Sequence, residues 1–274
     1  MRVTSVHTYP VKGCHRLDHD TVRVEPWGLA GDRRWMIVDA DGIGVTQRQY
    51  PVLATLRPVV RPGGLVLRGP GHPDLDVPEP AGVAPVAVRT FRHRKLPVDA
   101  LPAGPAADAW LTAALDRPVR LTWLARPTRH IAAGERTYDT GDQVSFADAY
   151  PLLLTVTASL DALNGWLTEA DAGPVPMTRF RPNVVVEGAP AWAEDSWAGR
   201  TLRIGATIFR AAGPCDRCVV TTTDQETGVR EHEPLRTLVR HRRIDRKVLF
   251  GLHLVPVSPG AVGVGDPVRV EPAP

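Results

Sequence analysis

Two cysteines separated by two residues, Cys215 and Cys218, form the strongest chemical motif in this sequence. A structural zinc site needs four ligands, and Cys14 is the only other cysteine in the chain. A thioredoxin-like redox pair expects the motif to open a helix, whereas the run at 219–223 is β-branched and disfavours one. Besides a zinc site and a redox pair, two further interpretations of the cysteine pair stay open. Both thiols are packed as small hydrophobic groups, or one thiolate ligates a soft metal beside Arg217.

Several basic side chains stand in turns or beside prolines, where they can face an anion. Lys12 lies in a Pro/Gly turn after an expected strand, Arg33 follows two glycines, and Arg181 is separated from Asn183 by a rigid proline. Arginine holds phosphate through two parallel hydrogen bonds. If the fold brings Lys12, Arg33, Arg181 and Arg217 to one face, they form a site for a multiply anionic small molecule. Taken singly, each is an ordinary solvated charge.

The composition is that of a folded chain with many short elements. The 274 residues are 43% hydrophobic and 23% charged, and 24 glycines and 27 prolines disfavour a bundle of long helices. The net charge is +3 without a block of like charges, which argues against nucleic acid as a fixed partner. Three cysteines, no apolar run of about 20 residues and no signal-peptide pattern favour a reducing, cytoplasmic location and argue against a membrane.

The elements that must position these side chains are mostly strands, with a few helices, so we expect an α+β fold. Period-two alternation and apolar runs between turn residues predict the strands, and apolar residues at helical spacing predict the helices. The predicted helices span 106–115, 159–170 with Ser159 as N-cap, and 234–242. The predicted strands span 2–9, 21–25, 35–38, 65–67, 184–187, 201–204, 207–211, 249–257 and 267–270. A domain boundary is expected near residues 116–120.

A series of short motifs occurs in an order that resembles one known family. They are 9–13 (YPVKG), 31–35 (GDRRW), 45–49 (VTQRQ), 180–183 (FRPN), 193–197 (AEDSW), 215–218 (CDRC), 221–223 (TTT), 227–228 (TG), 233–238 (EPLRTL) and 264–268 (VGDPV). Together they resemble the MOSC family with an N-terminal MOSC β-domain, in the branch of the mitochondrial amidoxime-reducing component. The resemblance implies a MOSC β-barrel at 119–272 packed with a smaller β-rich domain at 1–118.

The resemblance also implies a pterin-bound molybdenum cofactor, Mo-molybdopterin, with a protein cysteine on the molybdenum. The matching position is Cys218, which is therefore expected to be the metal ligand and the catalytic residue. Gly13 stands where relatives often have serine, and Tyr150 stands where they have a small serine or threonine. The positions that match cofactor contacts are Lys12, Gly13, Arg33, Tyr150, Arg181, Asn183, Asp216 and Arg217.

The resemblance implies an oxidoreductase that reduces N-hydroxylated compounds such as amidoximes, hydroxylamines and N-hydroxylated bases. The sequence has no Gly-x-Gly-x-x-Gly turn and no second cysteine cluster, so a separate ferredoxin, flavodoxin or flavin reductase is expected to supply electrons. Two alternatives follow from the same family. The chain is a sulfur carrier with a persulfide on Cys218, although a pyridoxal-phosphate domain that would make the sulfur is missing. Or it stores and transfers the molybdenum cofactor.

Overall fold

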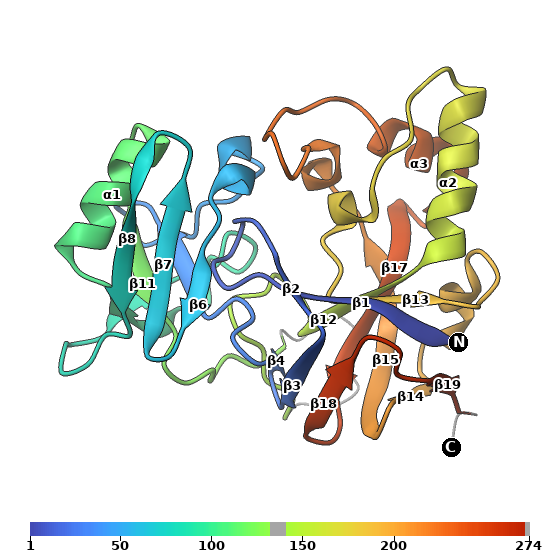
Figure 1. Cartoon of the computed structure of the whole chain (residues 1–274), viewed down its shortest axis with the longest axis horizontal. Helices are drawn as coiled ribbons and strands as arrows, with labels where there is room; N and C mark the ends of the chain where they lie inside the picture. Colours follow the sequence, from blue (N-terminus) through green and yellow to red (C-terminus); the bar gives the residue numbers. More distant parts are fainter. Residues whose placement is uncertain (132–140, 272–274) are drawn as a thin grey trace.

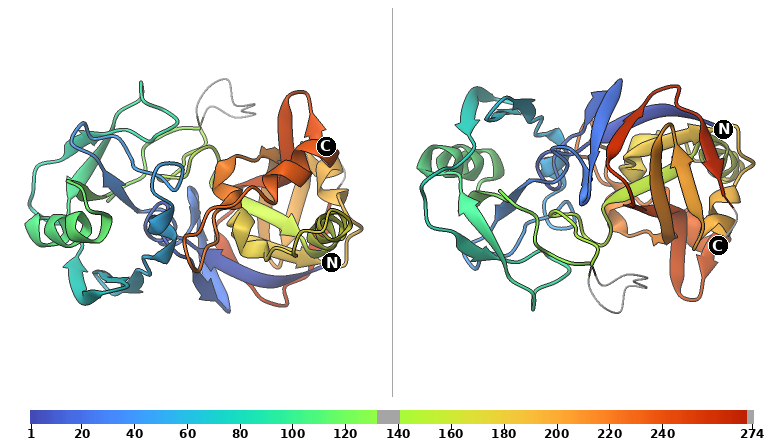
Figure 2. Two further views of the ribbon diagram at one scale, coloured as in Figure 1. Left: turned by 90° about the horizontal axis from the view of Figure 1, so that it is seen from above. Right: turned by 90° about the horizontal axis from the view of Figure 1, so that it is seen from below.

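The computed structural model describes residues 1–131 and 141–271, which form two lobes (Figure 1). The views from above and below show the lobes side by side (Figure 2). The first lobe contains β5 (Trp35–Val38), η1 (Pro51–Thr55), β6 (Val59–Arg61), β7 (Gly64–Gly69), β8 (His72–Pro78), β9 (Val86–Val88), β10 (Val98–Pro102), α1 (Pro105–Leu115) and β11 (Arg120–Trp123). No helix in the described ranges is long and apolar enough to span a membrane.

The second lobe is built on one large sheet, with β2 at one edge and β19 at the other. Its elements are β1 (Arg2–Thr8), β2 (Leu17–His19), β12 (Leu152–Val156), α2 (Thr157–Glu169), η2 (Met177–Phe180), β13 (Val184–Glu187), η3 (Ala193–Trp197), β14 (Thr201–Ile204), β15 (Thr207–Asp216), η4 (Val219–Thr222), α3 (Leu235–His241), β16 (Arg243–Ile244), β17 (Lys247–Pro256) and β19 (Val268–Val270). A small sheet of β3 (Thr21–Glu25), β4 (Gly28–Leu29) and β18 (Gly260–Gly263) joins it.

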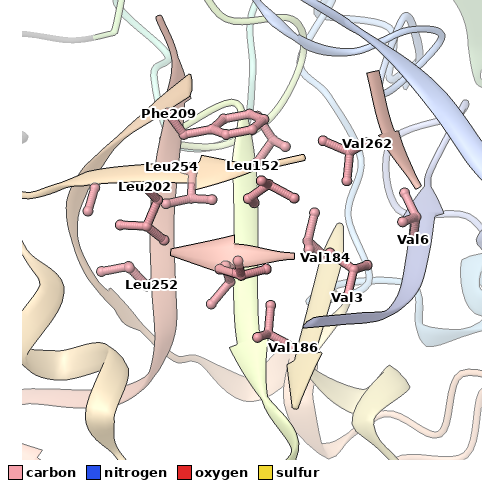
Figure 3. Close-up of a cluster of buried hydrophobic side chains, with 14 of the residues drawn as sticks. Val3, Val6, Leu152, Val184, Val186, Leu202, Phe209, Leu252, Leu254 and Val262 are labelled. Carbon is pink, nitrogen blue, oxygen red and sulfur yellow. The ribbon is translucent and has the colours of Figure 1, made fainter. Parts of the chain in front are cut away.

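The large sheet runs β19-β14-β15-β17-β12-β13-β1-β2, with β16 on β17. Its pairs are antiparallel except β12 with β13, which α2 connects as a crossover helix. Alternate side chains of these strands form one buried core that includes Val6, Leu152, Val184 and Phe209 (Figure 3). This burial is the main force that holds the sheet in register, because a slip of one residue would expose every one of these side chains.

The expected MOSC barrel is corrected to an open sheet whose ends approach each other. Within the described residues, no continuous strand pairing closes it. One isolated bridge, Arg2 with Pro267, joins β1 to the segment before β19, and the Val3 N–H donates to the carbonyl of Asp266 at 2.9 Å. The large sheet thus has the curvature of a barrel without its closed ladder.

The predicted α+β class is confirmed, and the predicted strands at 21–25, 35–38 and 184–187 coincide with β3, β5 and β13. All three predicted helices are present. The predicted N-cap Ser159 is wrong: α2 begins at Thr157, and Val156 occupies the cap position. The Ser159 hydroxyl instead donates to Oε2 of Glu194 at 2.9 Å, and this hydrogen bond satisfies the hydroxyl, which is buried.

The chain crosses between the lobes more than once. It begins in the large sheet, where β1 pairs with β13, and then enters the first lobe, where β5 pairs with β11 and β11 with β10. The core of that lobe is separate and packs α1, through Trp110 and Leu111, against β7 and β11. The crossing segments carry many of the polar residues singled out above. The boundary between 118 and 119 stays a prediction.

Candidate functional site

A pocket of about 190 Å³ opens where the crossing segments meet the ends of β12, β15 and β17. The structure brings all nine predicted site residues to its wall, although they span more than 200 positions of sequence. These are Lys12, Gly13, Arg33, Tyr150, Arg181, Asn183, Asp216, Arg217 and Cys218. Their contact with a cofactor stays a prediction. Sequence reasoning did not predict Arg48, Asp148 and His253 as site residues, and Cys215 of the two-cysteine motif also lies in the wall.

Lys12 is held in the turn after β1, where its N–H donates to the carbonyl of Trp35 at 2.8 Å. Its buried ammonium donates to the carbonyl of Phe146 at 2.6 Å and to the Asp148 carboxylate. Burial lowers the pKa of Lys12 to about 8, and the ion pair with Asp148 opposes that fall. An ammonium has three N–H groups, so these two contacts leave one for an anion in the pocket.

Arg48 and Asp148 connect Lys12 with Cys218. Both terminal nitrogens of Arg48 lie 3.3 Å from Oδ2 of Asp148, and its Nη2 also lies 3.4 Å from Sγ of Cys218. The motif at 45–49 was visible in the sequence, but the role of Arg48 depends on partners 100 and 170 residues away. Arg48 therefore places a positive charge directly beside the sulfur of Cys218.

Arg33 and Arg181 converge on one aromatic ring. Their guanidinium carbons lie 4.6 and 4.1 Å from the centroid of the buried Tyr9 ring. Both arginines have left-handed backbone, with φ of 48° and 54°, which is uncommon outside glycine and often accompanies function. Burial lowers the pKa of Arg181 to about 10, so the side chain still carries its charge at neutral pH. The Tyr9 ring therefore fixes two cations beside the pocket.

Asn183 is fully buried, and most of its amide is occupied by the protein. Its Oδ1 accepts hydrogen bonds from the Leu153 N–H at 3.1 Å and from Nη1 of Arg33 at 2.9 Å. Its Nδ2 donates to the carbonyl of His7 at 3.1 Å. Asn183 also makes a side-chain hydrogen bond with the buried Asp32 carboxylate, so it positions Arg33 and joins β1 to β12.

The two cysteines of the motif have different surroundings. Cys218 is half-buried just before η4. Cys215 is buried in β15, and Nη1 of Arg217 donates to its Sγ at 3.0 Å. Burial alone would raise the pKa of Cys215, but Arg217 and His253 outweigh it and lower that pKa to about 6. The cysteines are not joined by a disulfide, and Cys14 is buried in the first-lobe core with its pKa raised to about 12 by burial.

Three of the predicted site residues, Gly13, Tyr150 and Asp216, are engaged mainly with other parts of the protein. Gly13 has φ of 87°, which favours glycine, and its carbonyl accepts a hydrogen bond from Nε2 of Gln47 at 2.7 Å. The Tyr150 ring packs against His253 in a tilted arrangement, with ring centroids 4.6 Å apart. The Asp216 carboxylate accepts the N–H of Val248 at 2.9 Å, so that it anchors β17 beside the pocket.

The charge of the wall indicates the class of ligand. Among the residues that the structure describes, six cationic side chains and two carboxylates line the pocket. The cations are Lys12, Arg33, Arg48, Arg92, Arg181 and Arg217, and the carboxylates are Asp148 and Asp216. Nε of Arg217 is buried without a hydrogen-bond partner in the described ranges, which is costly unless a ligand accepts from it. Such a wall fits a multiply anionic molecule, with the Cys218 thiol at its side.

The described residues contain no group of three or more His, Cys, Asp or Glu side chains arranged to hold a metal ion. The part of the chain that the structure describes therefore offers the Cys215–Cys218 pair no further ligands for a structural zinc. The role of Cys218 as a metal ligand stays a prediction.

Comparison with known proteins places the whole chain in one family. The MOSC domain model matches residues 141–269, and the MOSC N-terminal beta barrel domain model matches residues 1–118. Human mitochondrial amidoxime-reducing component 1 is 33% identical, over 97% of this chain and 82% of its own length. The bovine mitochondrial amidoxime reducing component 2 is 31% identical over 97% and 82%. A rice molybdenum cofactor sulfurase is 29% identical over 93% of this chain but only 32% of its own length. The chain therefore belongs to the MOSC-domain family, in the group whose members also carry the MOSC N-terminal β-barrel domain.

Proposed function

We propose that this protein is a molybdenum-cofactor-binding oxidoreductase that reduces N-hydroxylated compounds. The observation that carries the proposal is the convergence of one half-buried cysteine, Cys218, with six cationic side chains in a single pocket. The names of the amidoxime-reducing relatives supply the reaction class, and their similarity extends over nearly the whole chain.

The residues of the pocket fit a pterin cofactor with a phosphate group. Lys12, Arg33 and Arg181 would hold its anionic groups through charge-assisted hydrogen bonds. The buried Nε–H of Arg217 would donate to one of its acceptors. Cys218 would be the protein ligand of the metal. When bound, the cofactor supplies two-electron, oxygen-removing chemistry, in which cleavage of an N–O bond consumes two electrons and two protons and releases water.

The protein's own contribution is position and electrostatics. Arg48 lies 3.4 Å from Sγ of Cys218 and places a positive charge beside this sulfur, and Asp148 holds Arg48 in place. Arg217 bridges Sγ of Cys215 and the carbonyl of Phe180, so the buried thiolate fixes the direction of this guanidinium. Tyr9 does the same for Arg33 and Arg181. A preorganised cationic pocket binds an anion without reorganisation when the ligand arrives.

We also propose that electrons come from a separate protein. Each turnover needs two electrons, and the sequence has neither a nicotinamide-binding glycine turn nor a second cysteine cluster. A mixture of the purified protein, NADH or NADPH and an amidoxime should show no steady turnover until a donor protein or an artificial reductant is added.

The test of the proposed function is reduction of benzamidoxime to benzamidine by protein purified from a host that makes the cofactor. Reduced methyl viologen serves as the donor, and product is measured by chromatography. We expect turnover by the wild type and by the Cys14→Ala control, and none by Cys218→Ser. Protein that contains molybdenum but forms no benzamidine, or a fully active Cys218→Ser variant, would contradict the proposal.

The second candidate is a sulfur carrier. Cys218 is half-exposed, and the Arg48 guanidinium beside it would also stabilise a persulfide. The rice sulfurase relative, which this chain matches over one third of its length, favours the same chemistry. Cyanide-labile sulfur on Cys218, seen as a mass increase of one sulfur atom without bound molybdenum, would support this candidate instead.

A further inference from the structure

Positive charge is concentrated on one exposed segment outside the pocket. Residues 236–247 contain six Lys and Arg residues and one Asp, a net charge of +5, whereas the whole chain carries +3. The rest of the protein is therefore net negative by two charges. We define the basic surface as the five exposed cations of this segment: Arg236, Arg240, Arg243, Arg246 and Lys247.

The fold presents these side chains on a rigid support. α3 ends at His241, and the tight β16–β17 hairpin follows, with Arg243 opposite Val248 and Ile244 opposite Lys247. Its two turn residues, Asp245 and Arg246, both have positive φ, 48° and 67°, as the favoured two-residue hairpin turn requires. The strands of the hairpin continue into the large sheet through β17.

The sixth cation of the segment is used inside the protein. Arg242 pairs with the Asp195 carboxylate, and its guanidinium carbon lies 4.3 Å from the centroid of the Trp192 ring. These contacts anchor the segment between α3 and the hairpin. The five cations of the basic surface remain exposed to solvent.

The basic surface is joined to the segment that carries Cys218. The N–H of Arg217 donates to the carbonyl of Val248 at 2.7 Å, and the N–H of Val248 donates to Oδ1 of Asp216 at 2.9 Å. α3 also contacts η4, which starts directly after Cys218. Figure 1 shows α3 beside the end of β17 on the same lobe. The hairpin and α3 thus support the Cys218 loop from two directions.

Nearby acidic groups reduce the charge without cancelling it: residues 231–247 hold six Lys and Arg against three Glu and Asp, a net charge of +3. Glu233 pairs with Nε of Arg236 at 2.7 Å, and Asp216 is occupied by the Val248 N–H. Glu231 and Asp245 are exposed, whereas Glu233 is half-buried. Two apolar side chains lie among the cations: Val239 is 39% exposed and Ile244 is 47% exposed. Cations around a few exposed apolar groups are typical of small, transient docking sites.

We infer that the basic surface is the docking face for an acidic electron-transfer protein, a flavodoxin or [2Fe–2S] ferredoxin with carboxylates around its redox centre. This inference rests on the proposed function and names the partner's chemistry and its place. Opposite charge steers such a partner to the face that adjoins the Cys218 loop, so its redox centre arrives close to the pocket. A nucleic acid fits less well, because the surface is one short segment on a chain that is otherwise net negative.

The test compares two matched double variants that each reverse two charges. Arg243→Glu with Lys247→Glu alters the basic surface, and Arg200→Glu with Arg269→Glu alters exposed arginines beside β14 and on β19. We expect the first pair to lower kcat/KM for reduced flavodoxin or ferredoxin by about tenfold or more at ~50 mM salt. It should leave turnover with reduced methyl viologen unchanged. At about 0.5 M salt the difference from wild type should largely disappear, because screening weakens the attraction.

Binding of the oxidised donor, followed by NMR line broadening, gives a readout that needs no turnover. Weaker binding by the first pair alone would support the inference even if no N-hydroxylated substrate were reduced, so the two proposals fail separately. Unchanged kcat/KM and binding in the first pair would overturn the inference. So would an equal loss in the control pair, or salt-sensitive binding of a single-stranded oligonucleotide to this face with no donor binding.

Discussion

Replacing Asp148 by asparagine removes the carboxylate that Lys12 and Arg48 share. Oδ1 of Asp148 accepts from the Lys12 ammonium, and Oδ2 lies 3.3 Å from both terminal nitrogens of Arg48, which in turn contacts Cys218. The variant keeps the shape of the side chain but removes its negative charge. Two cations then lose their common partner in a largely buried setting.

The cost in stability follows from the burial of the pair. Breaking a fully buried ion pair costs about 3–5 kcal/mol. Lys12 is 8% exposed, whereas Asp148 is 29% exposed, so we expect about 2–3 kcal/mol of lost unfolding free energy at neutral pH. The two cations hold the pKa of Asp148 well below its usual value of 3.8, so this contribution is complete above about pH 4–5. It is lost as the pH falls further, and the gap between the wild type and the variant should therefore shrink in acid.

The same variant changes the charge of Lys12. Burial already lowers the pKa of this lysine to about 8, and Asp148 is the largest influence that opposes the fall. In Asp148→Asn the pKa drops further, so Lys12 loses its proton at a lower pH and the pocket loses a positive charge. We expect molybdenum retention to decline above about pH 8 in the wild type and at a clearly lower pH in the variant.

The assays are urea unfolding between pH 3 and pH 8 and molybdenum content after dialysis across pH 6 to 9. Asp142→Asn is the matched control, because it breaks the ion pair with Arg210 at similar burial outside the pocket. The control should lose stability and keep the wild-type pH profile of molybdenum retention. An Asp148→Asn variant with wild-type stability, or with a retention profile that matches the control, would refute this reasoning.

Three further predictions follow from the site and its surroundings. Cys218→Ser should abolish reductase activity. Folded Cys215→Ser should stay active but lose about 1–3 kcal/mol of unfolding free energy, because Arg217 loses its partner. Equal loss of activity in both variants would favour a redox pair. Arg181→Lys should lower cofactor retention about tenfold, measured as molybdenum occupancy, because lysine lacks the planar fork; unchanged occupancy would contradict this. Burial raises the pKa of Glu194 from 4.5 to about 7, so the unfolding free energy should fall as the pH rises between these values. At pH 8 the unfolding free energy of Glu194→Gln should be about 2–3 kcal/mol higher than that of the wild type. A variant without this gain would refute the prediction.

Local pattern in the sequence predicted only part of the secondary structure. The strands β10, β11 and β12 were not predicted, whereas strands with a clear local signal were. Strict alternation at 21–25 and the apolar run at 35–38 each became a strand with the predicted bounds. The run at 219–223 disfavoured an α-helix and forms only the short 3-10 turn η4. The N-cap at Ser159 was wrong because α2 begins at Thr157; the Ser159 hydroxyl instead bonds Glu194, far along the chain. The open edge of the large sheet also depends on long-range pairing that local pattern does not show.

The residues of the site were predictable only where their own type or a local motif pointed to them. Lys12, Arg33, Arg181 and Cys218 have residue types that suit an anionic metal cofactor, and the resemblance gave them an order, but neither shows that they meet. Arg48 was missed as a site residue because its importance comes from contacts with Asp148 and Cys218 across the fold.

The low pKa of Cys215 has the same origin. It depends on Arg217 two residues away and on His253 across the sheet, which only the β15–β17 pairing brings close. Charge interactions of this kind decay with distance in space and leave no periodic pattern in the sequence.

The central claim is that Cys218 binds the metal of a molybdenum cofactor held by this pocket. Its most direct test is X-ray absorption at the molybdenum edge on wild type and Cys218→Ser, both purified from a cofactor-competent host, with metal content measured on the same samples. We predict close to one molybdenum per wild-type chain, and one sulfur ligand fewer on whatever molybdenum the variant retains. Wild-type protein without molybdenum, or the same number of sulfur ligands in both proteins, would contradict the claim.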